Sequence, residues 1–293
     1  MFSLDGALRY LSLAALYDGK QYLIEQYRLS VMTLAGNSRL KDKPDAQWRA
    51  AGFGVTKAFE GSSALPSVSA ELSGIIAANK GDTGQLGGEI MLDEKFTQQS
   101  MRQTLRKGYP VVHIASHFQF KPGNETASFL LLGDGGRLTI AELKTSANLF
   151  GGVQLLTLSA CNTGVGDGTE VEGFGTLAQR QGAKAVIASL WPVADAGASS
   201  LMREFYRIRE TSAGKTKLEA MQQAQLGLLR GTAKVDKTEA ARALIQVETI
   251  RVAKPTGPPF PFDEKAPYSH PYFWAPFFLM GKLAVTAKGS MIN

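Results

Sequence analysis

Two side chains of this sequence have the chemistry of a nucleophile and its base, and each one ends a short apolar run. The segment PVVHIASH ends at His117, and the segment VQLLTLSAC ends at Cys161, the only cysteine of the 293 residues. A neighbouring imidazole activates a thiol by lowering its pKa and by accepting its proton. If the two side chains meet, Cys161 would attack a peptide carbonyl and His117 would protonate the departing amine. The alternative is that Cys161 is a small buried hydrophobe, which is the commonest role of a lone cysteine.

The elements around these residues predict that they do meet. Short apolar runs bounded by Gly and Pro indicate buried strands, and near-continuous ones are typical of a parallel sheet covered on both faces. Between the two runs, the tetrad from Thr139 to Glu142 has the capping-box pattern and predicts a crossover helix. A right-handed strand–helix–strand unit ends both strands at one edge of the sheet, where open α/β sheets place their sites. The sequence therefore predicts an α/β fold with a mostly parallel sheet, helices on both faces, and His117 beside Cys161.

The other two histidines are weaker candidates for the base. His113 lies four residues before His117 in the same run, so both would face the same side of the sheet. Because His113 is in the middle of the strand, we expect it to be buried and hydrogen-bonded. His270 lies in a segment with six prolines, 254–271, and no role is expected for it. One cysteine and three histidines without ligand spacing predict no metal site.

The pattern of the remaining chain predicts an ordinary globular structure. Asp18-Gly19 is a strong turn signal and predicts an N-terminal antiparallel hairpin of residues 7–17 and 20–34. No apolar run approaches the roughly 20 residues that a membrane span needs. A single cysteine excludes an intrachain disulfide and fits a reducing compartment, so we expect a cytoplasmic protein. The further expected elements are helices over 66–78, 97–107 and 173–181, strands around 52–55, 129–132 and 185–190, a helix holding Leu201 and Ile208, a helix beginning at Thr216, and a last strand within 272–285.

The net charge of +6 is unevenly distributed along the chain. Residues 203–254 contain eleven Lys and Arg against six Asp and Glu, so most of the excess lies in one helical region. We interpret it as the solvated side of surface helices. A nucleic-acid surface is the weaker alternative, because no aromatic residues interleave with these charges for base stacking.

The glycine-rich segment that follows Cys161, residues 162–168, lacks the Gly-Lys-Ser/Thr ending of a phosphate loop. It is better suited to a sharp turn beside the sulfur that leaves backbone N–H groups free. The backbone N–H groups of Cys161 and of Phe118, the residue after His117, are therefore the expected donors to a tetrahedral oxyanion. Glu172, just before the next helix, is expected to complement the helix dipole.

Five segments carry a resemblance to a known family: LRYLSLAALYDGKQYLIEQY, VVHIASH, LLTLSACNTGVG, EGFGTLAQRQGAKAVIASLWPVAD and HPYFWAPFFLMGKL. In this order they resemble the successive blocks of the CHAT domain, a caspase- and separase-like cysteine protease family. The resemblance spans nearly the whole chain and implies a caspase-like fold, endopeptidase activity and no cofactor. By it, His117 and Cys161 match the catalytic dyad. Their separation of 44 residues is near the roughly 50 residues between the two residues in caspases.

The resemblance also suggests where the substrate binds. The segment from Trp191 to Asp195 follows a predicted strand at the same edge and resembles the segment that helps to line the first specificity pocket. Asp195 would favour Arg or Lys before the cleaved bond by charge pairing. The alternative is that Asp195 caps a helix beginning near Gly197. Both interpretations stay open.

Two departures from the family pattern bear on activity. Phe118 stands where the family usually has Gly after the catalytic His, and its side chain is expected to narrow the cleft. This favours an alternative in which the chain is an inactive interaction module. The chain also begins almost at the CHAT blocks, so a tetratricopeptide-repeat region or a separate regulatory protein is an expected partner, besides a protein substrate. We expect one domain over 1–293, with an accessory half (1–108) and a catalytic half (109–293).

Overall fold

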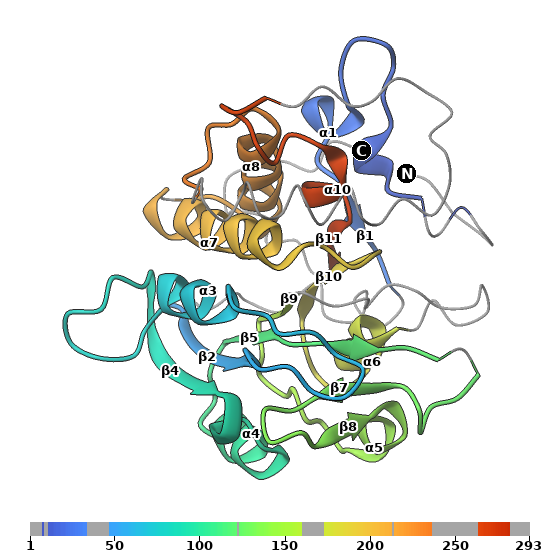
Figure 1. Cartoon of the computed structure of the whole chain (residues 1–293), viewed down its shortest axis with the longest axis vertical. Coiled ribbons are helices and arrows are strands. Elements are labelled where there is room, and N and C mark those ends of the chain that lie inside the picture. Colours follow the sequence, from blue (N-terminus) through green and yellow to red (C-terminus); the bar gives the residue numbers. More distant parts are fainter. Residues whose placement is uncertain are drawn as a thin grey trace.

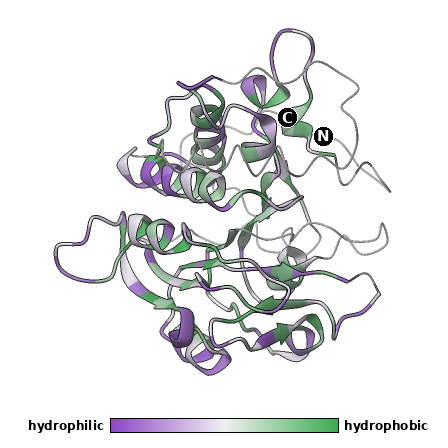
Figure 2. Cartoon of the chain, in the orientation of Figure 1, coloured by the Kyte–Doolittle hydropathy of each residue, from purple (hydrophilic) through white to green (hydrophobic). Residues whose placement is uncertain are grey.

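One large sheet divides the protein into two apolar layers (Figure 1). The computed structural model describes residues 8, 11–33, 47–121, 123–159, 173–212, 214–235 and 263–281. Figure 2 shows the hydrophobic residues concentrated on the strands and the hydrophilic ones on outward helix surfaces and loops. Within the described ranges, no helix is both long and apolar enough to span a membrane.

The large sheet has eight strands and is almost entirely parallel. Its spatial order is β1-β11-β10-β9-β5-β2-β4-β3, and only the pair β10 and β11 is antiparallel. The predicted mostly parallel sheet is therefore confirmed. The strands are β1 (Ser30–Val31), β2 (Arg49–Gly54), β3 (Ile76–Ala77), β4 (Leu86–Leu92), β5 (Val111–Ala115), β9 (Leu155–Ser159), β10 (Ala185–Ser189) and β11 (Phe277–Gly281).

Alternating side chains of the central strands supply both layers. In β9, Leu155 packs into one layer, whereas Leu156 and Leu158 pack into the other. In β10, Ile187 and Val186 are divided between the layers in the same way. Because successive side chains of a strand point to opposite faces, a run that is apolar at every position has to be covered on both sides.

Helices cover both faces of the sheet, as predicted. One face is covered by α3 (Val68–Ile75), α7 (Asp195–Thr211), α8 (Lys217–Leu229) and α10 (Pro271–Trp274), and the other by α4 (Gln98–Leu105), α5 (Ile140–Thr145) and α6 (Phe174–Arg180) (Figure 1). A small antiparallel sheet of β6 (Phe118–Gln119), β7 (Phe129–Leu131) and β8 (Arg137–Thr139) packs into the second layer. The short helices are η2 (Leu13–Ala15), α1 (Leu23–Gln26) and η3 (Asp93–Lys95).

The capping boxes that the sequence predicts are present. The Thr139 hydroxyl accepts from the Glu142 N–H at 3.1 Å and starts α5, and Thr216 starts α8 in the same way. Thr97 caps α4 through the Ser100 N–H at 3.0 Å. These hydroxyls satisfy N–H groups that have no partner within the helix, which explains why the local pattern fixes where each helix begins.

The predicted N-terminal hairpin is wrong except for its turn. Gly19 has φ +95°, the Asp18 carboxylate accepts from two following N–H groups, and one antiparallel bridge joins Tyr17 to Tyr22. The second arm then becomes α1, because the Glu25 carboxylate accepts the Tyr22 N–H at 2.8 Å and starts a helix there. The predicted last strand within 272–285 is confirmed as β11, although the short helix α10 precedes it.

Candidate active site

The sequence predicts that His117 and Cys161 lie at one edge of the large sheet. β5 and β9 are adjacent and parallel, and Ala115 is level with Ser159, so both strands end at the same edge, as predicted. His117 follows Ala115 by two residues, and Cys161 follows Ser159 by two. Cys161, the segment 162–168 and Glu172 lie outside the described residues, so the contact between Cys161 and His117 stays a prediction.

The imidazole of His117 is held by a backbone carbonyl. Its Nε2 lies 2.7 Å from the carbonyl oxygen of Ser63, in the loop between β2 and α3. A carbonyl oxygen only accepts, so Nε2 carries the hydrogen of this bond and, in the neutral ring, Nδ1 is the acceptor. The backbone of His117 is fixed from the other side, because its carbonyl accepts from the Leu131 N–H at 2.9 Å. The ring is half-buried, and its contact with the Ser63 carbonyl orients it.

Phe118 belongs to the core of the second layer. It begins β6, is level with Leu130 of β7, and is only 5% exposed. Its ring meets Phe174 of α6 edge-on, with 5.4 Å between the centroids. The expectation that its side chain narrows the cleft is therefore wrong, because the ring packs into the interior. The role of its N–H as an oxyanion donor stays a prediction.

Trp191 and Asp195 follow β10, which is parallel to β9 and ends at the same edge. The Trp191 indole N–H donates to the carbonyl of Tyr272 at 3.2 Å, and the side chain is half-buried. Asp195 is the first residue of α7, and its Oδ2 accepts from the Ser67 N–H at 2.6 Å. The expectation that Asp195 caps a helix beginning near Gly197 is wrong in detail, because α7 begins at Asp195 itself. The Asp195 carboxylate instead binds the start of α3.

His113 is buried and hydrogen-bonded, as predicted. It is fully buried, and its Nε2 lies 2.7 Å from Oε1 of Glu71, which is also fully buried. Its Nδ1 lies 3.4 Å from the hydroxyl of Tyr206, which in turn lies 2.8 Å from Oγ1 of Thr157. Burial raises the pKa of Tyr206 well above its usual value. This network joins α3, β5, α7 and β9 inside the protein and takes His113 away from the edge.

Sequence reasoning missed Ser63 and Asp93, which support this edge, and Glu71, which binds His113 in the interior. Asp93 follows β4, and its carboxylate accepts both the N–H and the hydroxyl of Thr56 at 2.7 Å. A non-glycine residue with φ +49° at a strand end is a signal of such a role, but it is visible only in the folded chain. None of the three residues belongs to a motif.

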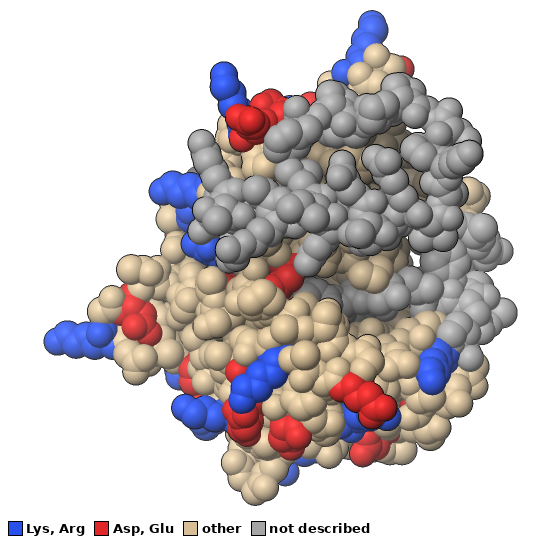
Figure 3. Space-filling view, viewed as in Figure 1, with Lys and Arg blue, Asp and Glu red and all other residues tan. Residues whose placement is uncertain are grey.

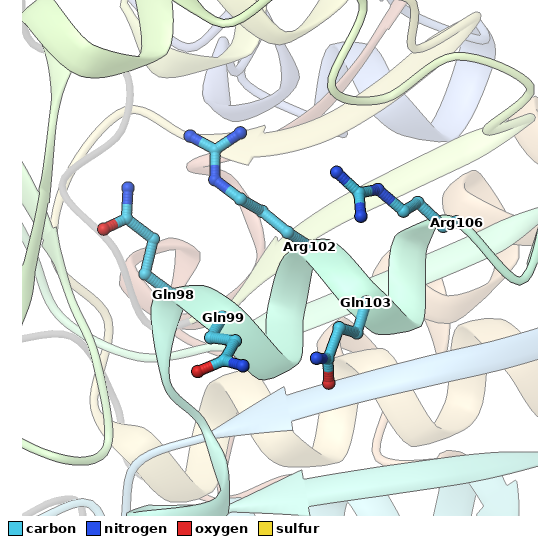
Figure 4. A pocket seen from close by; sticks show the side chains of 5 residues that line it. All are labelled: Gln98, Gln99, Arg102, Gln103 and Arg106. Carbon is cyan, nitrogen blue, oxygen red and sulfur yellow. The ribbon is translucent and has the colours of Figure 1, made fainter.

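Other features of the described surface offer no competing site. A hollow of about 460 Å³ is lined by four residues of α4 and by the residue that follows it: Gln98, Gln99, Arg102, Gln103 and Arg106 (Figure 4). It lies on the face of the sheet opposite α3 and α7. Among the described residues, no three His, Cys, Asp or Glu side chains gather as a metal site would require.

Comparison with known protein families assigns the chain to one of them. The CHAT domain matches residues 1–282, a range that includes both His117 and Cys161. The chain belongs to the CHAT domain family. A search of curated proteins found no match to this CHAT chain.

Two solved structures resemble the CHAT chain at low identity. The crystal structure of the Arg-specific cysteine proteinase gingipain R (RGPB) matches with 11% identity and a TM-score of 0.40, covering 80% of this chain and 46% of that one. The complex of Porphyromonas gingivalis RgpB pro- and mature domains matches with 12% identity and a TM-score of 0.41, covering 88% and 51%. The CHAT chain spans about half the length of each of these structures.

Proposed function

We propose that this CHAT chain is a caspase-like cysteine endopeptidase in which Cys161 is the nucleophile and His117 the acid and base. The observation that carries the proposal is the 2.7 Å hydrogen bond from His117 Nε2 to the Ser63 carbonyl at the carboxyl edge of the sheet. A histidine tied in this way has one defined tautomer, with Nδ1 available to take a proton. Membership of the CHAT family supports a protease-type function.

The sequence position of Cys161 supports a contact with this imidazole. Adjacent strands lie about 4.8 Å apart, and Ala115 is level with Ser159. Two residues of chain span at most about 7 Å, so Cys161 is never far from Ser159, and His117 is never far from Ala115. The two residues therefore follow neighbouring strand ends of one edge, which supports the pairing that thiol activation requires.

The proposed reaction proceeds by acyl transfer to the thiol. Nδ1 of His117 takes the thiol proton, and the thiolate sulfur forms a bond to the peptide carbonyl carbon. The oxyanion is held by the backbone N–H groups of Cys161 and Phe118. The tetrahedral intermediate expels the amine, which leaves with the proton from Nδ1. Water then attacks the thioester, gives a proton to His117, and releases the carboxylic acid and the free thiol.

The proposed substrate is a peptide segment of a protein, bound across this edge. Trp191 is proposed to form one wall, which is supported by its position after β10 at the edge and by its hydrogen bond to the Tyr272 carbonyl. Asp195 would favour a basic residue before the cleaved bond if its carboxylate faces the substrate. A repeat region or a regulatory protein is the proposed partner that controls access.

A second function is favoured by one departure from the family pattern: Phe118 stands where the family usually has Gly, and it restricts the backbone after His117 although its ring packs into the core. In that case the chain is a catalytically inactive interaction module with the same fold. The two functions differ in one measurable property, which is turnover of a peptide by the intact chain.

The test is hydrolysis of a fluorogenic peptide library by the full chain, with and without candidate partner proteins. The proposal predicts turnover by the wild type, none by Cys161→Ala, and a loss of about 10²-fold or more in kcat for His117→Ala. Asp82→Ala is the control, because its carboxylate accepts two N–H groups of the loop between β3 and β4 and contacts no residue of the proposed site. Turnover that survives Cys161→Ala, or a folded wild type that cleaves nothing under any of these conditions, would sink the endopeptidase proposal.

A further inference from the structure

We propose that Asp93 and Asp195 are positioning residues that hold the loop of residues 55–67, between β2 and α3, so that the Ser63 carbonyl selects the tautomer of His117. The consequence for catalysis rests on the proposed function, whereas the consequence for the tautomer does not. Neither carboxylate then needs to contact the substrate. The two act on His117 only through the loop.

The first anchor is Asp93, which follows β4 and binds Thr56 at the beginning of the loop. Both of its carboxylate oxygens are engaged by Thr56, Oδ1 by the N–H and Oδ2 by the hydroxyl, each at 2.7 Å. Asp93 has φ +49°, a left-handed conformation that non-glycine residues other than Asp and Asn rarely adopt. Such a conformation persists only where neighbouring contacts hold it, and sites of this kind cluster at functional positions.

The second anchor is Asp195 at the end of the loop. Its Oδ2 accepts from the Ser67 N–H at 2.6 Å, a short charge-assisted bond, and its Oδ1 is buried. Ser67 is the residue directly before α3, so α7 and α3 are joined at their first turns. Because β10 leads into α7, this anchor ties the loop to the same sheet edge as His117.

Between the anchors the loop is closed on itself. The Leu65 N–H donates to the Thr56 carbonyl at 3.0 Å, and Phe59 and Ser62 exchange two backbone hydrogen bonds of 3.0 and 2.9 Å. Ser63 lies between these pairs, and its carbonyl accepts from His117. The loop has no helix of its own, so a change at Thr56 or at Ser67 would shift Ser63 directly. A shift of about 1 Å is enough to cost a catalytic group on the order of 10²-fold in rate.

Replacement by asparagine distinguishes this positioning role of Asp195 from a role as substrate ligand. An asparagine keeps an oxygen that accepts from the Ser67 N–H, but it loses the charge that would pair with Arg or Lys. Asparagine also tolerates the left-handed conformation at position 93 and can bond both Thr56 groups. Asparagine variants should therefore keep the His117 tautomer, and alanine variants should lose it.

The direct test is the ¹⁵N signature of the His117 ring, which distinguishes the two neutral tautomers. The chain has three histidines, so each signal is assigned by single His→Gln variants. We expect one Nε2–H tautomer in the wild type, in Asp93→Asn and in Asp195→Asn, and a mixture in Asp93→Ala and Asp195→Ala. Asp82→Ala is the matched control, since its carboxylate accepts two loop N–H groups (3.0 and 2.8 Å) between β3 and β4. A single tautomer in both alanine variants would overturn the proposal.

If the alanine variants do not fold, Thr56→Val replaces them, because it removes one bond to Asp93 and leaves both aspartates in place. The same mixture of tautomers is expected in Thr56→Val, and an unchanged ring would overturn the proposal.

Peptide hydrolysis tests the positioning role of Asp195 separately from the proposed endopeptidase function. Asp195→Ala should lower kcat by about tenfold or more, alike for basic and neutral residues before the cut, and Asp195→Asn should restore most of it. Loss confined to Arg and Lys substrates in both variants would instead make Asp195 a substrate ligand. A wild type that cleaves nothing but shows the expected tautomer pattern would remove the proposed function and leave the positioning role standing.

Discussion

At the scale of single residues, the three histidines differ because their partners differ. His117 meets a backbone carbonyl at a sheet edge, His113 meets a buried carboxylate, and His270 accepts a backbone N–H. The position of His113 within its strand was enough to predict its burial. The partners Ser63 and Glu71 were not predictable, because each lies in a segment about 40 or more residues away with no motif of its own.

His270, for which the sequence suggested no role, caps α10. Its Nδ1 accepts from the Tyr272 N–H at 3.1 Å, which requires the ring nitrogen to be unprotonated, and burial lowers the pKa of His270. A lowered pKa in the folded state gives stability that is present above the unfolded value of about 6.5 and is lost as the pH falls below it. His270→Asn keeps an acceptor without titrating.

We therefore expect the melting temperature of the wild type to fall more than that of His270→Asn between pH 7.5 and pH 5.5. Thermal unfolding of both proteins at the two pH values measures this difference. An equal fall in the two proteins would show that His270 does not contribute to the acid sensitivity.

At the scale of elements, local patterns were reliable where local contacts decide the outcome. The three threonine caps begin their helices where the sequence places them, and β5, α5 and β9 form the predicted unit. β4 was missed, because Gly87 and Gly88 make it look unlike a strand. A Cβ on Gly88 would lie 1.8 Å from the Ala50 carbonyl oxygen, so the glycine reflects close approach of neighbouring strands, a contact that no local pattern reveals.

The packing of α3 on the sheet depends on a buried polar pair, Glu71 and His113. Glu71→Ala would leave the His113 ring buried without its 2.7 Å partner, and breaking such a pair costs about 3–5 kcal/mol. We expect a loss of that order in the free energy of unfolding, measured with urea. The double variant Glu71→Met with His113→Leu, which removes both polar groups, should recover most of it. If Glu71→Ala were as stable as the wild type, the pair would not stabilise the packing of α3.

At the scale of the whole molecule, charge gives little support to a nucleic-acid surface. On the face shown in Figure 3, basic and acidic side chains of the described residues are interspersed. Within the described part of 203–254, several basic side chains have nearby acidic partners, including Arg207 with Glu204 at 2.6 Å and Arg209 with Glu210 at 2.7 Å. These pairs agree with the interpretation of the region as the solvated side of surface helices.

The whole molecule also determines how far the site could be predicted. Two parallel strands that end at one edge follow from the pattern of the chain, and so does the position of His117. The support of its ring does not, because the loop 55–67 is held by residues that follow β4 and β10. Contacts between the ends of non-consecutive strands depend on the strand order, and that order emerges only when the sheet is assembled.

The rate at which Cys161 reacts with iodoacetamide, measured from pH 5 to pH 9, tests the central claim most directly. The reagent carries no peptide, so the rate reports on the thiol and its base and not on substrate recognition. We predict fast alkylation of Cys161 near neutral pH in the wild type, and in His117→Ala a slower reaction that rises only toward the ordinary thiol pKa of about 8.5. Slow alkylation with the same pH profile in both proteins would contradict an activated Cys161 and His117 pair.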